Sequence, residues 1–222
     1  MTEHDYRFQE LKTRHRAERD NYHENLGLRV HRALSWLQRA EVADDLDGKF
    51  IFLWVAFNAA YANEIDGDGG RTQQKAFVEF LRKLQALDSD GILDRLVWQE
   101  FPKSIRLLLD NRYVFASFWD WQKGKIEAPA WEERFRKGKA AANRALADQD
   151  TATVLAIVLR RTYVLRNQVI HGGATWNSGV NRDQVRDCVQ LLGQLVPAVV
   201  EIMMNNPETL WGDASYPVVK DA

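Results

Sequence analysis

The sequence predicts an all-α fold, and three features of the sequence lead to this prediction. Apolar residues recur at helical spacing through long segments, for example Val154, Val158, Leu165 and Val169. Acidic, glycine-containing breaks separate these segments, most clearly at residues 44–48 and 88–91. In the best-defined segment, residues 151–171, Thr151 with Asp150 before it is the expected N-cap, and a glycine pair follows the last residue directly.

Residues 6–40 are predicted to form one or two helices with a strongly basic surface. Three histidines, His15, His23 and His31, recur there every eight residues. Eight residues span about 12 Å along one helix, too far for two ligands of a single metal ion, so we expect no metal site. Residues 49–63 follow as the most apolar helix, which should run through the core.

The middle of the chain, residues 71–147, is predicted to be a helical insertion within a single domain that covers residues 1–222. The loop before it, residues 64–70, lacks the ligand pattern of a calcium site. Within the insertion, Pro102 should kink a helix or start a new one. The aromatic residues at 113–121 are expected to be core or dimer-interface anchors rather than side chains that stack on bases. Helices are expected at residues 71–87, 92–109 and 131–147.

After residue 171, a loop should lead to a helix that Asn181 caps and that Pro197 kinks. Cys188 is the single cysteine, which excludes an intramolecular disulfide and a cysteine-based zinc site, and we expect it to be a buried small apolar residue. Residues 205–222 should pack as an irregular C-terminal tail, because the segment contains aromatic residues but no regular period.

Composition describes an ordinary globular chain of 222 residues, with 45% hydrophobic and 27% charged residues. The net charge of −1 gives no global basic field that would indicate a nucleic-acid partner. The first residues are charged and contain no apolar signal segment. The longest apolar run that we identify, residues 50–61, is too short to span a membrane. We therefore expect a cytoplasmic protein without a membrane partner.

One short motif concentrates polar chemistry at the end of the predicted helix 151–171. Arg166, Asn167 and His171 bring a guanidinium, an amide and an imidazole within six residues. His171 should occupy the last turn, where the helix carbonyls favour a cation. On an ideal helix Arg166 and His171 point about 140° apart, so they would meet only through unwinding at the glycines or across a two-fold axis. Spacing alone also fits a capping histidine and a surface arginine.

The motif and its helical context resemble the HEPN superfamily, whose signature is Arg, a polar residue that is often Asn, three to five further residues, and His. Arg166, Asn167 and His171 match this signature position by position, and RNQVIHGGATWNSGVNRDQVRD is the most specific stretch. The resemblance extends from the helix at residues 50–61 to Asn205-Asn206-Pro207. It implies an up-and-down helical bundle, here with extra helices inserted in the middle, and a homodimer.

The resemblance also implies metal-independent RNA cleavage with no cofactor, in which the 2′-OH attacks the adjacent phosphate and leaves a 2′,3′-cyclic phosphate. An imidazole can transfer the protons, a guanidinium can hold phosphate oxygens, and Asn167 can orient either group. Asn58 has two interpretations: a core amide bonded to a neighbouring helix, or a supporting residue that orients the imidazole. Five basic residues are candidates for an RNA-binding face: Arg134, Arg136, Lys137, Arg160 and Arg161.

Many HEPN proteins act in toxin–antitoxin or phage-defence systems, so an antitoxin or regulatory protein is a further expected partner. An antitoxin of the nucleotidyltransferase type is one form that this partner could take. The alternative is a non-catalytic HEPN-like module that binds RNA, a nucleotide or a partner protein. Toxicity that disappears in His171→Ala would favour cleavage, and harmless expression would favour the binding module.

Overall fold

The computed structural model describes the backbone of residues 4–61 and 71–213, and the side chains of residues 7–61 and 77–213. In these residues the chain forms helices joined by short turns, without a strand, so the predicted all-α class is confirmed. The expected loop at residues 64–70 and the end of the expected tail, from residue 214, lie outside the described part.

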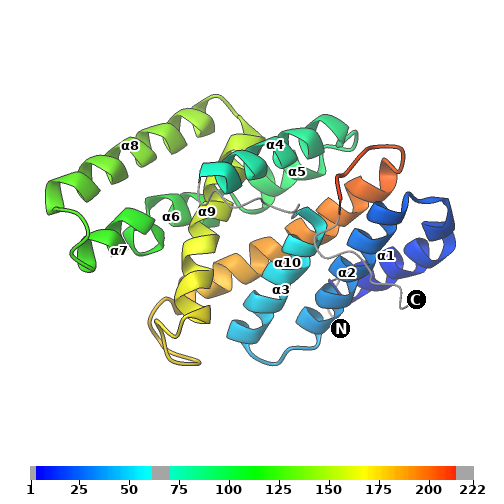
Figure 1. Ribbon diagram of the computed structural model, residues 1–222, viewed down its shortest axis with the longest axis horizontal. Helices are drawn as coiled ribbons and strands as arrows, with labels where there is room; N and C mark the ends of the chain where they lie inside the picture. Colours follow the sequence, from blue (N-terminus) through cyan, green and yellow to red (C-terminus); the bar gives the residue numbers. More distant parts are fainter. Residues whose placement is uncertain (1–3, 62–70, 214–222) are drawn as a thin grey trace.

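The elements follow the chain in this order: α1 (His4–Glu18), the 3-10 turn η1 (Arg19–Asn21), α2 (Glu24–Glu41), α3 (Leu46–Tyr61), α4 (Arg71–Leu87), α5 (Ile92–Arg95), the π turn η2 (Leu96–Glu100), α6 (Pro102–Asp110), the 3-10 turn η3 (Arg112–Val114), α7 (Ala116–Gln122), α8 (Ala128–Ala147), α9 (Thr151–Ile170) and α10 (Arg182–Asn205). Figure 1 shows α1, α2, α3 and α10 packed side by side as one group. The helix α9 contacts α3, α4, α6, α8 and α10, and α6, α7 and α8 extend from its other side. The helix that carries the motif is therefore central.

One continuous apolar core connects the first helix to the residues after α10. The helices of the segment 71–147 contribute unequally to this core. Phe77, Leu81 and Leu84 place α4 in this core, beside α9 and α10. By contrast, α7 packs mainly on the start of α8, outside the main core.

The crowded aromatic residues form an outer aromatic cluster between α7 and α8. Its members contact one another with ring centroids 5.2–5.9 Å apart, which suits offset or edge-to-face packing. The cluster consists of Phe115, Phe118, Trp121, Trp131 and Phe135. Because these rings pack on each other, they act as a small core of their own, in agreement with the expectation of packing anchors.

The C-terminal helix α10 is long and apolar enough to cross a membrane, which the inspection of apolar runs missed. It is the single helix of this kind in the described residues, and 72% of its most apolar window is buried inside the fold. Burial against α2, α3 and α9 is what a core helix of a globular domain shows. Pro197 lies inside this helix and is buried.

Two helix starts can be compared with the expectations. Pro102 starts a new helix, α6, after the π turn, which is one of its two expected effects. Asp150, rather than Thr151, caps α9, because its carboxylate accepts the Thr153 N–H at 3.0 Å. This difference moves the cap of α9 by one residue and leaves the order of the helices unchanged.

His15 and His31 lie close together, which the argument from one continuous helix did not foresee. The chain reverses at η1, so α1 and α2 pack side by side and the two imidazole centroids are 6.1 Å apart. The spacing of about 12 Å expected along one helix does not apply, because the two histidines lie on different helices. In the described residues, however, no group of three or more His, Cys, Asp or Glu side chains is arranged to hold a metal ion.

Cys188 is buried on α10, as expected, with its sulfur 3.6 Å from the Thr162 hydroxyl. Burial raises the pKa of the thiol to about 12. Because the thiolate is the reactive form, we expect iodoacetamide to modify the folded protein at pH 8 at least about a hundredfold more slowly than the urea-unfolded protein. Mass spectrometry over time measures both rates, and equal rates would contradict the buried thiol.

Candidate functional site

The candidate site begins where α9 ends, and two glycines determine how the helix stops. Gly172 has φ of +68°, the left-handed conformation predicted for it. Its N–H donates to the Val169 carbonyl at 3.3 Å. The Gly173 N–H donates to the Gln168 carbonyl at 2.7 Å, which completes a Schellman motif. A Cβ on Gly173 would lie 3.1 Å from that carbonyl oxygen, so a larger residue there would crowd the turn after His171.

Arg166 lies half-buried at the edge of the core, and two contacts orient its guanidinium. Its Nη1 donates to Asn167 Oδ1 at 2.9 Å. The guanidinium carbon lies 5.6 Å from the ring centroid of Tyr163, one turn earlier on α9. Its Nε is buried and has no hydrogen-bond partner in the structure described. Its Nη2 is not among the buried nitrogens and makes no hydrogen bond with the described residues, so it can donate to an anionic ligand.

His171 follows the last residue of α9, and its side chain is exposed. Its backbone N–H donates to the Asn167 carbonyl at 3.0 Å, which fixes the backbone but leaves the imidazole unrestrained. No hydrogen bond or ion pair joins Arg166 to His171 among the described residues, in keeping with the divergence of about 140° expected on a helix. One copy of the chain therefore presents the two groups separately.

The loop that follows, residues 174–181, is tied to the start of α3. Asp47 accepts hydrogen bonds from both terminal nitrogens of Arg182, at 3.2 and 3.0 Å. The same carboxylate accepts the backbone N–H of Asn177 at 2.8 Å. Because the Arg182 and Asp47 side chains are only 22% and 14% exposed, this ion pair is partly shielded from water. It holds the loop beside the end of α9.

Asp45 holds the same loop through Trp176. Its carboxylate accepts the Gly48 N–H at 2.7 Å, as a helix N-cap does, and the Trp176 indole N–H at 3.3 Å. The bond from Gly48, supported by the bond from Trp176, lowers the pKa of the Asp45 carboxyl. A pocket of about 230 Å³ lies between this loop and α9, with Leu165 and Val169 in its wall.

Gln168 connects the end of α9 to two other segments. Its amide nitrogen donates to the Tyr113 carbonyl at 2.8 Å, and its amide oxygen accepts from Asn181 Nδ2 at 2.9 Å. Asn181 was expected to cap α10. It does occupy the N-cap position, but its φ is +62° and its side chain makes no capping bond; its amide nitrogen donates to Gln168.

Large apolar side chains are exposed in the segments that meet at the end of α9. The exposed fractions are 47% for Ile170, 73% for Trp176 and 68% for Val180. Tyr113, whose carbonyl binds Gln168, is 41% exposed. We call these four residues the motif-end surface. Exposed apolar groups gathered in one region are typical of an interaction surface.

The five basic residues predicted to bind RNA differ in burial and lie on two helices, α8 and α9. Arg161 is only 4% exposed and lies over the Phe115 ring, 4.3 Å from its centroid, so the structure removes it from the set. Burial, and then the charge of Arg160, lowers the pKa of Arg161 to about 10. Arg160 is half-buried, and burial lowers the pKa of this guanidinium also.

The other three basic candidates lie in the first half of α8. Arg136 and Lys137 both pair with Glu133, at 2.5 and 3.1 Å, so part of their charge is neutralised. Arg134 is exposed. In Figure 1 the first half of α8 lies well apart from the end of α9. This basic stretch therefore does not border the motif within one copy.

Asn58 lies near the end of α3, whereas the loop beside the motif contacts the start of that helix at Asp47. Eleven residues separate the two positions, which is about three turns of helix. Trp54, between them, already packs on Tyr163 with ring centroids 6.0 Å apart. No hydrogen bond joins Asn58 to Arg166 or His171 among the described residues, and its supporting role stays a prediction. Its half-buried side chain makes no hydrogen bond within the described residues.

Several residues of the site were not predicted from the sequence. Tyr163 precedes Arg166 by three residues, a spacing that places both on one helix face and that should have identified the contact. The roles of Asp47, Gln168 and Trp176 had no local signal, because their partners lie far away in the chain.

Comparisons of this chain with protein-family models, with curated proteins and with solved structures found no match.

The Asp47–Arg182 pair gives a test of how the loop is held. Asp47→Asn removes the charge that compensates the partly buried Arg182, so the free energy of unfolding should fall by about 1–3 kcal/mol. Urea denaturation followed by circular dichroism measures the change. Asp44→Asn is the matched control, because Asp44 is exposed and lies three residues before Asp47. It should change the free energy of unfolding by less than about 0.5 kcal/mol. Equal effects of the two variants would show that the pair does not hold the loop.

Proposed function

We propose that this protein is a metal-independent endoribonuclease of the HEPN type, which acts as a homodimer on RNA. The observation that supports the proposal most is the arrangement at the end of α9. There the Arg166–Asn167 pair sits at the edge of the core, and the exposed His171 follows one turn later. Anion-binding and proton-transferring groups thus occupy one helix end, next to an exposed apolar surface.

In the proposed reaction an imidazole takes the proton from the ribose 2′-OH while this oxygen attacks the adjacent phosphorus. The bond from phosphorus to the 5′-oxygen breaks, and the products are a 2′,3′-cyclic phosphate and a 5′-OH. The leaving 5′-oxygen takes a proton from a second imidazole. Arg166 binds the non-bridging phosphate oxygens and stabilises the charge that accumulates on them. Asn167 keeps the guanidinium oriented through its 2.9 Å hydrogen bond.

The proposed reaction needs two acid–base groups, whereas one motif supplies a single imidazole. A two-fold dimer through the motif-end surface would bring His171 of each copy to one composite site. The same dimer would cover Ile170, Trp176 and Val180, which are exposed in one copy. It would also bring together the guanidinium of one copy and the imidazole of the other, which do not contact within a single chain.

The cellular setting belongs to the same proposal. A ribonuclease without a cofactor can act wherever RNA is found, so we place the protein in the cytoplasm, in a toxin or phage-defence system. An antitoxin or regulatory protein would then control access to the motif-end surface.

Cleavage of mixed cellular RNA in EDTA tests the catalytic proposal. We expect the wild type to leave cyclic-phosphate ends, and we expect His171→Ala and Arg166→Ala each to slow cleavage by about a hundredfold or more. Analysis of the RNA end groups together with gel-based rates measures both effects. His31→Ala, which removes an exposed histidine on α2, is the matched control and should cleave at the wild-type rate.

Unchanged cleavage in His171→Ala or Arg166→Ala, with folding intact, would remove that residue from the mechanism. Intact RNA with every variant, including the wild type, would contradict the enzyme proposal. That result would favour the non-catalytic binding module that the same motif also fits.

The dimer is tested separately from the chemistry. Trp176→Glu places a charge on the motif-end surface, so we expect the dissociation constant of the dimer to rise by about tenfold or more. Light scattering after size-exclusion chromatography gives the mass as a function of concentration. Leu210→Glu is the control, because Leu210 is 80% exposed and follows the last residue of α10, whereas the loop after the motif contacts the start of that 24-residue helix. A wild type that stays monomeric at high concentration would contradict the composite site.

A further inference from the structure

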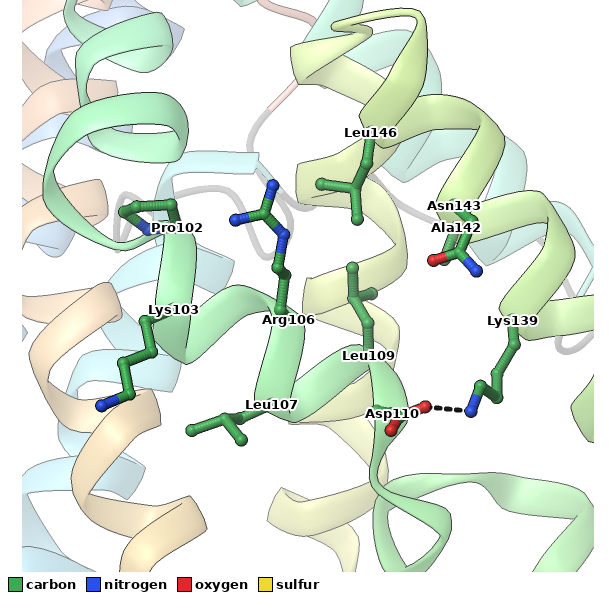
Figure 2. A pocket seen from close by; sticks show the side chains of 10 residues that line it. All are labelled: Pro102, Lys103, Arg106, Leu107, Leu109, Asp110, Lys139, Ala142, Asn143 and Leu146. Atoms are coloured by element: carbon green, nitrogen blue, oxygen red, sulfur yellow. Dashed lines mark ion pairs between the residues drawn. The ribbon is translucent and has the colours of Figure 1, made fainter.

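A groove of about 550 Å³ lies between α6 and α8, and Figure 2 shows the side chains that line it. None of these lining residues belongs to α9, to the loop after α9 or to the motif-end surface. The volume is within the range of pockets that hold small organic molecules. The groove is therefore a second site, separate from the one proposed for RNA cleavage.

The polar lining of the groove carries an excess of positive charge. The lining contains three cations, Lys103, Arg106 and Lys139, and one carboxylate, Asp110. The net charge of the lining residues is therefore +2. Lys139 forms an ion pair with Asp110. Lys103 and Arg106 make no ion pair or side-chain hydrogen bond with the residues that the structure describes. Two cations thus remain available to an anionic ligand.

Figure 2 shows how these groups are placed. The Arg106 side chain extends from α6 toward Leu146 on α8, so its guanidinium lies inside the groove. Lys103 points away from α8 at the margin. On the other side, Asn143 and the Asp110–Lys139 pair present amide, carboxylate and ammonium groups. A ligand with one anionic end and several hydroxyl groups would find a partner for each.

A buried charge beneath the groove adds to the positive potential. The Arg161 guanidinium donates to the carbonyl of Leu109, a residue that lines the groove, at 3.4 Å. Arg161 pairs with aromatic rings, and no ion pair with a carboxylate is found for it in the described residues. A positive charge in a low-dielectric interior is weakly screened, so it favours an anion above it.

The apolar part of the lining is aliphatic. Leu107 is 57% exposed, and Leu109, Ala142 and Leu146 complete the surface. No aromatic side chain lines the groove. Single-stranded nucleic acid binds largely by stacking its bases on aromatic rings, so this lining does not favour it. A compact molecule fits better, because it needs only contact of its carbon framework with aliphatic side chains.

We propose that the groove between α6 and α8 binds a small phosphate ester with a hydroxylated body, such as a phosphorylated ribose. The phosphate oxygens accept hydrogen bonds from Arg106, with Lys103 at the margin. The vicinal hydroxyl groups donate to Asp110 and accept from Lys139 and Asn143. This chemistry is shared by a free sugar phosphate and by a nucleotide, and the groove binds it independently of RNA cleavage.

Isothermal titration calorimetry on the full chain tests the proposal with four probes at equal ionic strength: ribose 5-phosphate, AMP, adenosine and inorganic phosphate. We expect at least one ester to bind more tightly than inorganic phosphate and adenosine. Equal affinity for the two esters identifies the sugar phosphate as the ligand, and preference for AMP identifies a nucleotide. If neither ester binds more tightly than inorganic phosphate, or adenosine binds as tightly as AMP, the proposal is overturned.

Variants locate the binding. Arg106→Gln should weaken the bound ester by about tenfold or more, because a charge-assisted hydrogen bond to phosphate is lost. Arg144→Gln makes the same change at an exposed arginine on α8 that does not line the groove, and it should leave the affinity unchanged. Equal weakening by both variants, or none by Arg106→Gln, would place the ester elsewhere. RNA cleavage is not a readout in these assays, so their outcome is independent of the ribonuclease proposal.

Discussion

Burial of α9 among five other helices is the constraint on which the rest of the structure depends. The side chains from Ala152 to Leu159 are almost all buried, so neither the rotation of this helix nor its position along its axis is free. Burial ends at Leu165, and the motif begins with the next residue. Arg166 therefore sits at the boundary of the core, and His171 lies beyond it in water.

The net charge is only −1, but the guanidinium groups of Arg29 and Arg161 are both buried, and they are compensated in different ways. Arg29 is buried and donates to the backbone carbonyls of Ala60 and Asp213, at 2.9 and 2.6 Å. Arg161 lies between aromatic rings, with an Nε that has no hydrogen-bond partner in the structure described. The first arrangement ties segments of the core together, whereas the second leaves a weakly compensated charge near the surface formed by α6 and α8.

The two proposed sites share α9 as a support but differ in how they are built. The end of α9 is held through Gln168 by the Tyr113 carbonyl and by Asn181, and Asp47 at the start of α3 holds the loop that follows. The groove lies where α6 and α8 are separated. At the α7 end of α8, the outer aromatic cluster packs beside these helices. Fixed loops suit chemistry that requires geometry, and an open groove suits reversible binding.

Local sequence patterns were enough to predict most of the long helices, the left-handed turn at Gly172 and the burial of Cys188. These follow from local periodicity and from the backbone preference of glycine. The packing of the helices was needed to show that Arg161 is buried and that His15 lies beside His31. The physical reason is that a periodic pattern shows which face of a helix is apolar but not which other helix covers that face. A long cationic side chain can also be satisfied by rings or carbonyls from distant segments, which no local pattern reveals.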